Sequence, residues 1–308
     1  MSRFLSILVK KISNKDISVK KSYKLLRFMQ KITNPNLFNK EKYEDVFFNV
    51  GDRQIRCRFF SPQNINDKTK VIIFIHGGGW ATGCVDSYTK TCIELSKRTG
   101  RMIITIDYRL APEYPYPCGF NDCYDIVNLL IDNLRKNGLK SKDICLMGDS
   151  AGGNLVAAIS LKSRATRDFK VKKQILLYPA LQNDYSDTTK YKSVITNGKD
   201  FLLTQKQLQE YMELYVSDKE KLNSPYVSPL KSRFPCFQPN TLIITADKDP
   251  LRDEGKAYAK KLSLFFNKVT YHNVNGAMHG FFTMPIYKTY SEEAYEKILK
   301  FLGDEDEQ

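Results

Sequence analysis

The 308-residue sequence has no long apolar segment. Its two apolar runs near residues 71–75 and 102–106 are too short to span a bilayer and are typical of buried strands. The apolar stretch Phe4 to Val9 is short for a secretory signal, and it is followed by two lysines and by no small-residue cleavage site. We therefore expect a cytoplasmic protein without integral membrane contact.

Histidine and paired cysteine motifs are also scarce. The chain has three histidines, none of them at metal-ligand spacing. Its seven cysteines are odd in number and include no Cys-x-x-Cys pair, so we interpret them as reduced thiols. The sequence thus predicts no metal site, and nothing in it requires an organic cofactor.

Acidic residues are the minority, with 34 Asp and Glu against 48 Lys and Arg and a net charge of +14. Residues 1–42 hold eleven of these cations but only Asp16 and Glu41. Such a region can contact nucleic acid or an anionic membrane, or it can be the solvated face of amphipathic helices. Because no nucleic-acid-binding motif is present, we expect no nucleic-acid partner. Peripheral membrane contact through the basic N-terminus stays open.

The apolar pattern beyond residue 42 predicts an α/β fold. Residues 45–50 and 54–60 flank Gly51-Asp52 as a hairpin, and strands then alternate with helices. This order predicts a mostly parallel, twisted sheet flanked by helices. Expected strands are 71–75, 101–106, 143–147, 172–178, 241–246 and 268–274, and expected helices are 87–99, 120–137, 152–163, 253–266 and 286–302.

The alternation is interrupted at residues 181–239, a segment too long for a simple strand-to-helix loop. We interpret it as an insertion above the carboxyl ends of the strands, where open α/β sheets bind ligands. With the N-terminal helical segment 1–42 it would form a cap on a core made of 43–180 and 240–308. Aromatic and apolar residues of the insertion either line a pocket or pack the cap: Phe201, Leu202, Tyr211, Tyr215 and Phe234.

The most informative motif is Gly148-Asp149-Ser150-Ala151-Gly152, between an expected strand and an expected helix. A serine on a tight strand-to-helix turn flanked by glycines is typical of the nucleophile of acyl-transfer hydrolases. The alternative is a small-residue turn in which Ser150 only caps the helix.

A serine nucleophile needs a base, and the base needs a carboxylate to orient it. His279 is the candidate base because it follows the last strand within a glycine-containing loop, whereas His272 lies inside the strand pattern. The acid should follow the strand 241–246. Spacing leaves Asp247, Asp249 and Asp253 as candidates, with Asp253 also suited to capping the next helix.

Donors for an oxyanion are expected in His76-Gly77-Gly78-Gly79-Trp80, directly after the strand 71–75. Its glycines allow backbone N–H groups to approach a substrate oxygen, and the N–H of Ala151 would supply another donor. A phosphate-binding loop is the rival interpretation, but its Gly-x-x-x-x-Gly-Lys-[Ser/Thr] pattern is absent.

Together these motifs resemble the hormone-sensitive-lipase-like group of α/β-hydrolase fold esterases, over roughly residues 45–302. The resemblance is carried by the segments 76–80, 107–113, 148–154, 249–255 and 278–281, which occur in the family's order.

This resemblance implies a triad of Ser150, Asp249 and His279 and an oxyanion hole of Gly78, Gly79 and Ala151. It implies supporting roles for His76 and Gly77 in shaping the loop, and for Asp149 as a hydrogen-bonding residue beside the nucleophile.

The implied function is a serine carboxylesterase that hydrolyses short-chain esters, with a small-molecule ester as its partner and no cofactor. Two alternatives stay open: an amide hydrolase of the arylacetamide-deacetylase type, and a non-catalytic ligand-binding relative, as among the plant gibberellin receptors, which lack the histidine. The chain is expected to be a monomer or a homodimer.

Overall fold

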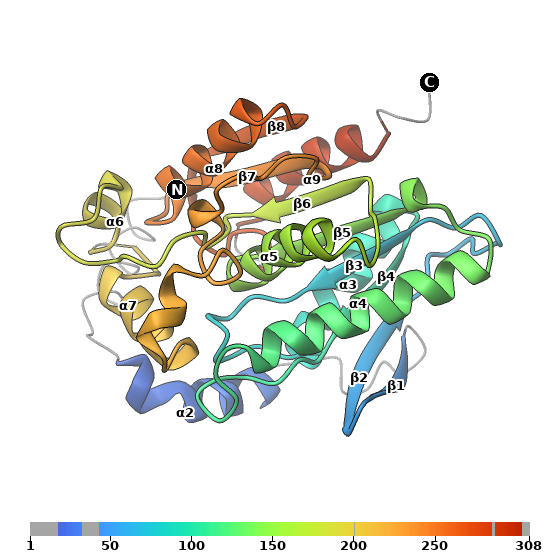
Figure 1. Ribbon diagram of the computed structural model, residues 1–308, viewed down its shortest axis with the longest axis horizontal. Helices are drawn as coiled ribbons and strands as arrows, with labels where there is room; N and C mark the ends of the chain where they lie inside the picture. The colour runs from blue at the N-terminus through green and yellow to red at the C-terminus, as the bar shows by residue number, and fades with distance from the viewer. Residues whose placement is uncertain (1–17, 33–42, 200, 285–286, 304–308) are drawn as a thin grey trace.

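The computed structural model describes residues 18–32, 43–199, 201–284 and 287–303, and it has a single sheet covered by helices on both faces (Figure 1). Within these residues eight strands lie in the order β1-β2-β4-β3-β5-β6-β7-β8. The β1–β2 and β2–β4 pairs are antiparallel and all others are parallel. The predicted α/β class, with a hairpin that leads into a mostly parallel sheet, is confirmed. The strands are β1 (Glu44–Val50), β2 (Arg53–Phe60), β3 (Val71–Ile75), β4 (Met102–Ile106), β5 (Ile144–Asp149), β6 (Lys173–Leu177), β7 (Asn240–Lys248) and β8 (Val269–Met278).

The central strands are apolar throughout because both of their faces are covered. In β3, Ile73 and Ile75 belong to the core under α4, α5 and α8, whereas Ile72 and Phe74 belong to the core under α3 and α9. Side chains alternate between the faces of a strand, so one five-residue strand contributes to both cores. The longer helices are α2 (Val19–Ile32), α3 (Val85–Thr99), α4 (Cys118–Lys136), α5 (Ala151–Thr166), α7 (Gln205–Tyr215), α8 (Arg252–Leu264) and α9 (Lys288–Gly303).

The last two strands are longer than their sequence patterns indicate. β7 continues to Lys248 and β8 to Met278, because their pairing resumes after an irregularity between Ala246 and Lys248. Residues 275–278, which we expected in a loop, are therefore strand, and His279 directly follows β8. Bulges of this kind re-aim side chains at the end of a strand.

The connection between β6 and β7 carries α6 (Lys192–Asn197), α7 and two 3₁₀ turns, η4 (Lys219–Asn223) and η5 (Pro229–Lys231). Figure 1 shows α2, α6 and α7 gathered at one end of the sheet. The start of α2 is held on α7, where the N–H of Val19 donates to Glu210 at 2.5 Å and Lys20 pairs with Glu213. Of the expected N-terminal segment 1–42, residues 1–17 and 33–42 lie outside the described residues.

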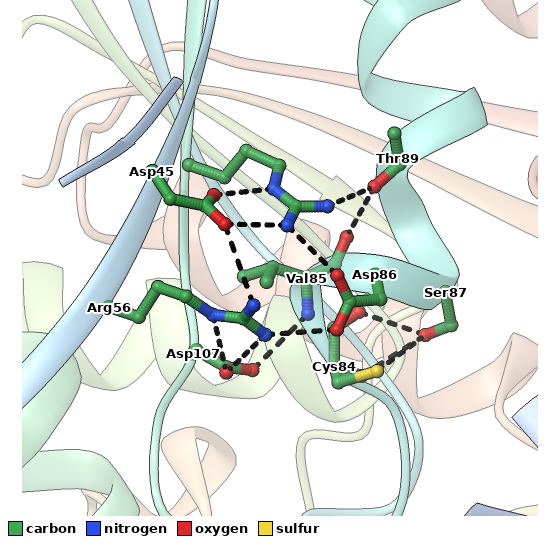
Figure 2. Close-up of polar contacts among 9 residues, drawn as sticks. Asp45, Arg56, Cys84, Val85, Asp86, Ser87, Thr89 and Asp107 are labelled. Carbon is green, nitrogen blue, oxygen red and sulfur yellow. Dashed lines mark hydrogen bonds and ion pairs between the residues drawn. The ribbon is translucent and has the colours of Figure 1, made fainter. Parts of the chain in front are cut away.

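An ion-pair cluster joins the β1–β2 hairpin to the start of α3, whose N-cap residue is Cys84 (Figure 2). The buried guanidinium of Arg58 donates to both oxygens of Asp45 at 2.6 and 2.7 Å, and it lies 2.9 Å from Asp86. Arg56 bridges Asp107 and Asp86 at 2.8 and 3.0 Å. The cluster therefore anchors the amino end of α3 to the sheet.

Replacing Arg58 by methionine should lower the free energy of unfolding by about 2 kcal/mol, because the aliphatic stem is kept while the half-buried carboxylates of Asp45 and Asp86 lose the hydrogen bonds and charge of the buried guanidinium. Urea denaturation measures the change. Lys221→Met is the matched control, because its exposed pair with Asp218 should contribute less than about 0.5 kcal/mol. Equal effects of the two variants would contradict the structural role of the cluster.

The same cluster predicts a pH dependence. The hydrogen bonds from Arg58 hold the pKa of Asp45 below its ordinary value. This part of the stability is thus present at neutral pH and is lost as the pH falls below the ordinary carboxyl range. Arg58→Met should flatten the acid limb of the stability curve.

Candidate active site

The ends of β5, β7 and β8 bring Ser150, Asp249 and His279 together. Each of these residues directly follows its strand, and the strands are parallel members of one sheet. The carboxyl ends of parallel strands meet at one edge, so residues far apart in the sequence become neighbours there.

Ser150 lies on the turn between β5 and α5 with φ 53° and ψ −119°, a conformation that non-glycine residues rarely adopt. Its N–H donates to the carbonyl of Leu177 at 2.8 Å. A Cβ atom at Gly152 would stand 2.0 Å from the carbonyl oxygen of Ile75, so the helix approaches the sheet this closely only with glycine. Among the described residues the Ser150 hydroxyl caps no helical N–H, and the capping alternative is wrong.

A chain of hydrogen bonds links the three side chains. The Nδ1–H of His279 donates to Asp249 at 2.8 Å, because a carboxylate oxygen can only accept. The Nε2 atom of His279 then accepts from the Ser150 hydroxyl at 2.9 Å. Asp249 is fully buried, and its other oxygen accepts from the N–H of Leu251 at 2.8 Å.

The other candidate acids have different contacts. Asp247, within β7, accepts from the N–H of Gly276 at 3.3 Å and lies 3.5 Å from Arg252. The expectation that Asp253 caps its own helix is wrong: it lies in the first turn of α8 and accepts from the N–H of Ser193, at the start of α6.

Among the described residues, neither of the other two histidines forms a hydrogen bond with Ser150. His272 contacts Glu293 of α9 at 2.6 Å. His76 is buried and stacked on Tyr108 with ring centroids 4.4 Å apart, and its Nδ1–H donates to the carbonyl of Gly77 at 2.8 Å. Burial lowers the pKa of His76, which favours the neutral ring.

The glycine loop after β3 turns sharply beside Ser150. Gly78 and Gly79 have φ +110° and +61°, and Cβ atoms there would stand 2.3 Å from the Thr82 carbonyl oxygen and 2.2 Å from the Tyr211 ring. No described residue accepts a hydrogen bond from the N–H groups of Gly78, Gly79 or Ala151. The N–H of Gly77 is already used, since it donates to Asp149 at 2.8 Å.

Asp149 joins the glycine loop to α3. It accepts from Gly77 and, at 3.0 Å, from the hydroxyl of Tyr88. Burial raises the pKa of Asp149 to about 6, against the opposing effect of these two hydrogen bonds. At neutral pH the carboxylate is therefore ionised and holds both donors. Tyr88 is a residue that sequence reasoning missed, because nothing in the pattern of α3 distinguishes it from a core aromatic.

A cavity of about 700 Å³ opens at Ser150. The glycine loop, Ser150 and His279 line one part of the cavity. Apolar side chains from the connection between β6 and β7 line a second part, and more polar side chains from α2 and α3 line a third. The apolar group is Leu203, Leu208 and Tyr211, joined by Met284 from the segment after β8, and the polar group is Gln30 of α2 with Ser87, Lys90 and Thr91 of α3.

Of the insertion residues that we expected to line a pocket or pack, Tyr211 lines the cavity. Tyr215 is buried and stacks on Trp80 with centroids 4.4 Å apart, and Phe201 and Leu202 pack against the core. Phe234 does not line the cavity: its ring is exposed at the surface and contacts the ring of Phe265 edge-on.

Helix α2 is fastened to the glycine loop, which the sequence did not predict. The Arg27 guanidinium donates to the carbonyls of Ala81 and Ala111, each at 2.7 Å, and pairs with Glu113. Gln30 accepts from the N–H of Gly83 at 2.9 Å. Helix α2 is basic but contains no recognisable motif, so the sequence alone could not predict these contacts.

Among the described residues, no group of three or more His, Cys, Asp or Glu side chains is arranged to hold a metal ion. None of the described helices has the length and apolar character needed to cross a membrane.

Known proteins resemble the chain over most of its length. It is 32% identical to an arylesterase of Saccharolobus solfataricus, over 78% of this chain and 77% of the relative, and 28% identical to the carboxylesterase NlhH of Mycobacterium tuberculosis, over 87% and 84%. The solved structure of a hyperthermophilic esterase from the archaeon Pyrobaculum calidifontis superposes with a TM-score of 0.86 at 28% identity, covering 99% of this chain and 98% of that one.

The sequence pattern of the alpha/beta hydrolase fold matches residues 72–283, which include the glycine loop, Ser150, Asp249 and His279. The chain therefore belongs to the alpha/beta hydrolase fold family that includes the hormone-sensitive-lipase-like esterases.

Proposed function

We propose that the protein is a serine carboxylesterase that hydrolyses short-chain carboxylic esters through an acyl-enzyme intermediate. The observation that carries the proposal is the hydrogen-bonded series Ser150, His279 and Asp249, at 2.9 and 2.8 Å, on the wall of a cavity. The esterase names of relatives along most of the chain support the reaction class.

In the proposed reaction the Ser150 hydroxyl attacks the ester carbonyl while Nε2 of His279 takes its proton. Asp249 holds the imidazole in the tautomer with hydrogen on Nδ1 and stabilises the imidazolium. His279 then gives the proton to the departing alcohol. Water, deprotonated by His279, attacks the acyl-enzyme and releases the carboxylic acid and the free serine.

The oxyanion of each tetrahedral intermediate would accept hydrogen bonds from the N–H groups of Gly78, Gly79 and Ala151. One such donor contributes about 3 kcal/mol to transition-state stabilisation in related chemistry. Gly77 is left out of this set because its N–H is used by Asp149. We assign Asp149, His76 and Gly77 to holding the loop in shape.

We also propose that the segments 1–42 and 181–239 together form a cap over a core of 43–180 and 240–308. The contacts of α2 with α7 and with the loop after β3 support this division, as do the cavity-lining side chains Leu208 and Tyr211 of α7. The seven unpaired cysteines support a cytoplasmic location.

Acyl-chain length should limit turnover. A cavity of about 700 Å³ must hold both the acyl and the alcohol parts of the substrate. We expect kcat/KM for p-nitrophenyl esters to be highest for acyl chains up to about six carbons and to fall at least tenfold by about ten carbons, because further methylenes find no additional apolar wall. Sustained activity at long chains would indicate a lipase instead.

A fluorophosphonate probe tests whether the serine is activated at all. We expect labelling of wild-type protein and none of the Ser150→Ala variant. An unlabelled wild-type protein would favour the ligand-binding alternative. Paired ester and amide substrates with the same acyl group separate esterase from amidase activity, and the proposal requires the ester to be preferred.

A further inference from the structure

The edge of the sheet opposite the cavity displays large apolar side chains. β7 and β8 begin at Asn240 and Val269, and the segments just before them expose Phe234 by 79%, Phe237 by 77%, Leu264 by 66% and Phe266 by 99%. Soluble proteins rarely cluster such exposed side chains without a binding role.

The backbone holds these side chains outward. Phe237 and Phe266 have φ +57° and +58°, a conformation that bulky residues rarely adopt. Asn267 ties the two segments together: its amide nitrogen donates to the carbonyl of Pro235 at 2.7 Å, and its amide oxygen accepts from the N–H of Gln238 at 2.7 Å. The exposure therefore belongs to two hydrogen-bonded turns.

Cations surround the aromatic residues. The segments before β6, β7 and β8 expose seven basic side chains, and within 163–173, 230–239 and 263–270 the only carboxylate is that of Asp168. The seven are Arg164, Arg167, Lys170, Lys172, Lys231, Arg233 and Lys268. With Phe234, Phe237, Leu264 and Phe266 they form what we call the basic–aromatic face.

A smaller cavity of about 370 Å³ lies within this face, and its lining includes four cations, Arg135, Arg164, Arg167 and Lys170, together with Phe237 and one carboxylate, that of Asp168. In the described part of the chain, no carboxylate forms an ion pair with these four cations. The volume and the charge suit the phosphate of a lipid headgroup.

We propose that the basic–aromatic face docks on the surface of membranes that contain anionic phospholipid. The phenylalanines and Leu264 enter the boundary between headgroups and acyl chains, and the arginine-lined cavity takes a headgroup phosphate. Such binding combines buried apolar area with electrostatic attraction.

Two other occupants fit the face less well. A second copy of the chain would bring seven cations against seven, which repel. Single-stranded nucleic acid stacks its bases on open aromatic faces. Here the Arg164 guanidinium covers the Phe237 ring at 4.7 Å, and Phe234 packs edge-on with Phe265 at 6.1 Å.

Docking in this way leaves the cavity at Ser150 facing away from the bilayer, since Ser150, Asp249 and His279 lie at the carboxyl ends of the strands. The inference thus concerns location rather than the proposed esterase activity, and each can fail without the other.

Co-sedimentation of the full chain with vesicles tests the proposal. We expect binding to phosphatidylcholine vesicles with about 30 mol% phosphatidylserine, weak binding to pure phosphatidylcholine, and loss of binding when salt rises from about 0.1 to 0.5 M. Combined Phe234→Ser, Phe237→Ser and Phe266→Ser should weaken binding at least tenfold. Combined Arg164→Ser, Arg167→Ser and Lys170→Ser should weaken it roughly a hundredfold, at about fivefold per cation.

Control variants test whether vesicle binding depends on this face or on exposed aromatic and basic residues anywhere on the surface. Phe47→Ser on β1, and Lys219→Ser with Lys221→Ser on η4, remove exposed aromatic or basic residues elsewhere and should leave binding unchanged. All variants should keep activity on a soluble ester, which verifies folding. Unchanged vesicle binding by both face variants would overturn the proposal and assign any membrane contact to other regions such as the basic N-terminus. Binding of a single-stranded oligonucleotide without vesicle binding would overturn it in favour of nucleic acid.

Discussion

Alanine in place of Ser150 should lower kcat for p-nitrophenyl acetate by roughly 10⁴- to 10⁶-fold. The hydroxyl that His279 contacts at 2.9 Å is then absent, so no acyl-enzyme can form. Some rate above that of water should remain, because the oxyanion donors and the cavity still bind the transition state. Burst-phase kinetics on the wild type and initial rates on the variant measure the difference.

The substitution should leave the fold intact. Ser150 already has φ 53°, and alanine at the same position carries the same backbone cost, so the turn is no more strained than before. Ser87→Ala is the matched control, because Ser87 lines the same cavity and its hydroxyl contacts only the start of α3. Its activity should stay within about tenfold of wild type, as expected for the loss of a helix-capping contact. A Ser150→Ala variant with a tenth or more of wild-type turnover would contradict the proposed nucleophile.

The serine and the histidine could be predicted from local sequence because each has a local signature. Ser150 lies in a glycine-flanked turn between a strand and a helix, and His279 is the one histidine that follows a late strand. Turn chemistry is a property of a few adjacent residues, so a single sequence carries it. The alternation of short apolar strands with amphipathic helices is local in the same way, and it predicted the parallel sheet.

Contacts made across the fold had no such signature. Asp149 accepts hydrogen bonds from Tyr88 and Gly77, and Arg27 donates one to Ala81. These hydrogen bonds join residues between 54 and 72 positions apart in the sequence. Which aromatic residue of α3 faces the site depends on how α3 packs on the sheet. The lengths of β7 and β8 depend on their mutual pairing past Ala246, which no property of either strand alone indicates.

Spacing in the sequence could not identify the acid among Asp247, Asp249 and Asp253, because the choice depends on which carboxylate reaches His279 across the fold. Asp249→Asn should lower kcat by roughly 10⁴-fold while leaving KM little changed. An amide group at this position can donate to Nδ1 of His279, which favours the tautomer with hydrogen on Nε2. That nitrogen then cannot accept the Ser150 proton. Asparagine keeps an oxygen for the N–H of Leu251, so the loop before α8 should stay folded.

Asp247→Asn is the matched control, two residues away and of the same chemistry. Its side chain contacts Arg252 and Gly276 and not His279, so kcat should fall by less than about tenfold. The reverse pattern, with Asp247→Asn inactive and Asp249→Asn active, would move the acid to Asp247.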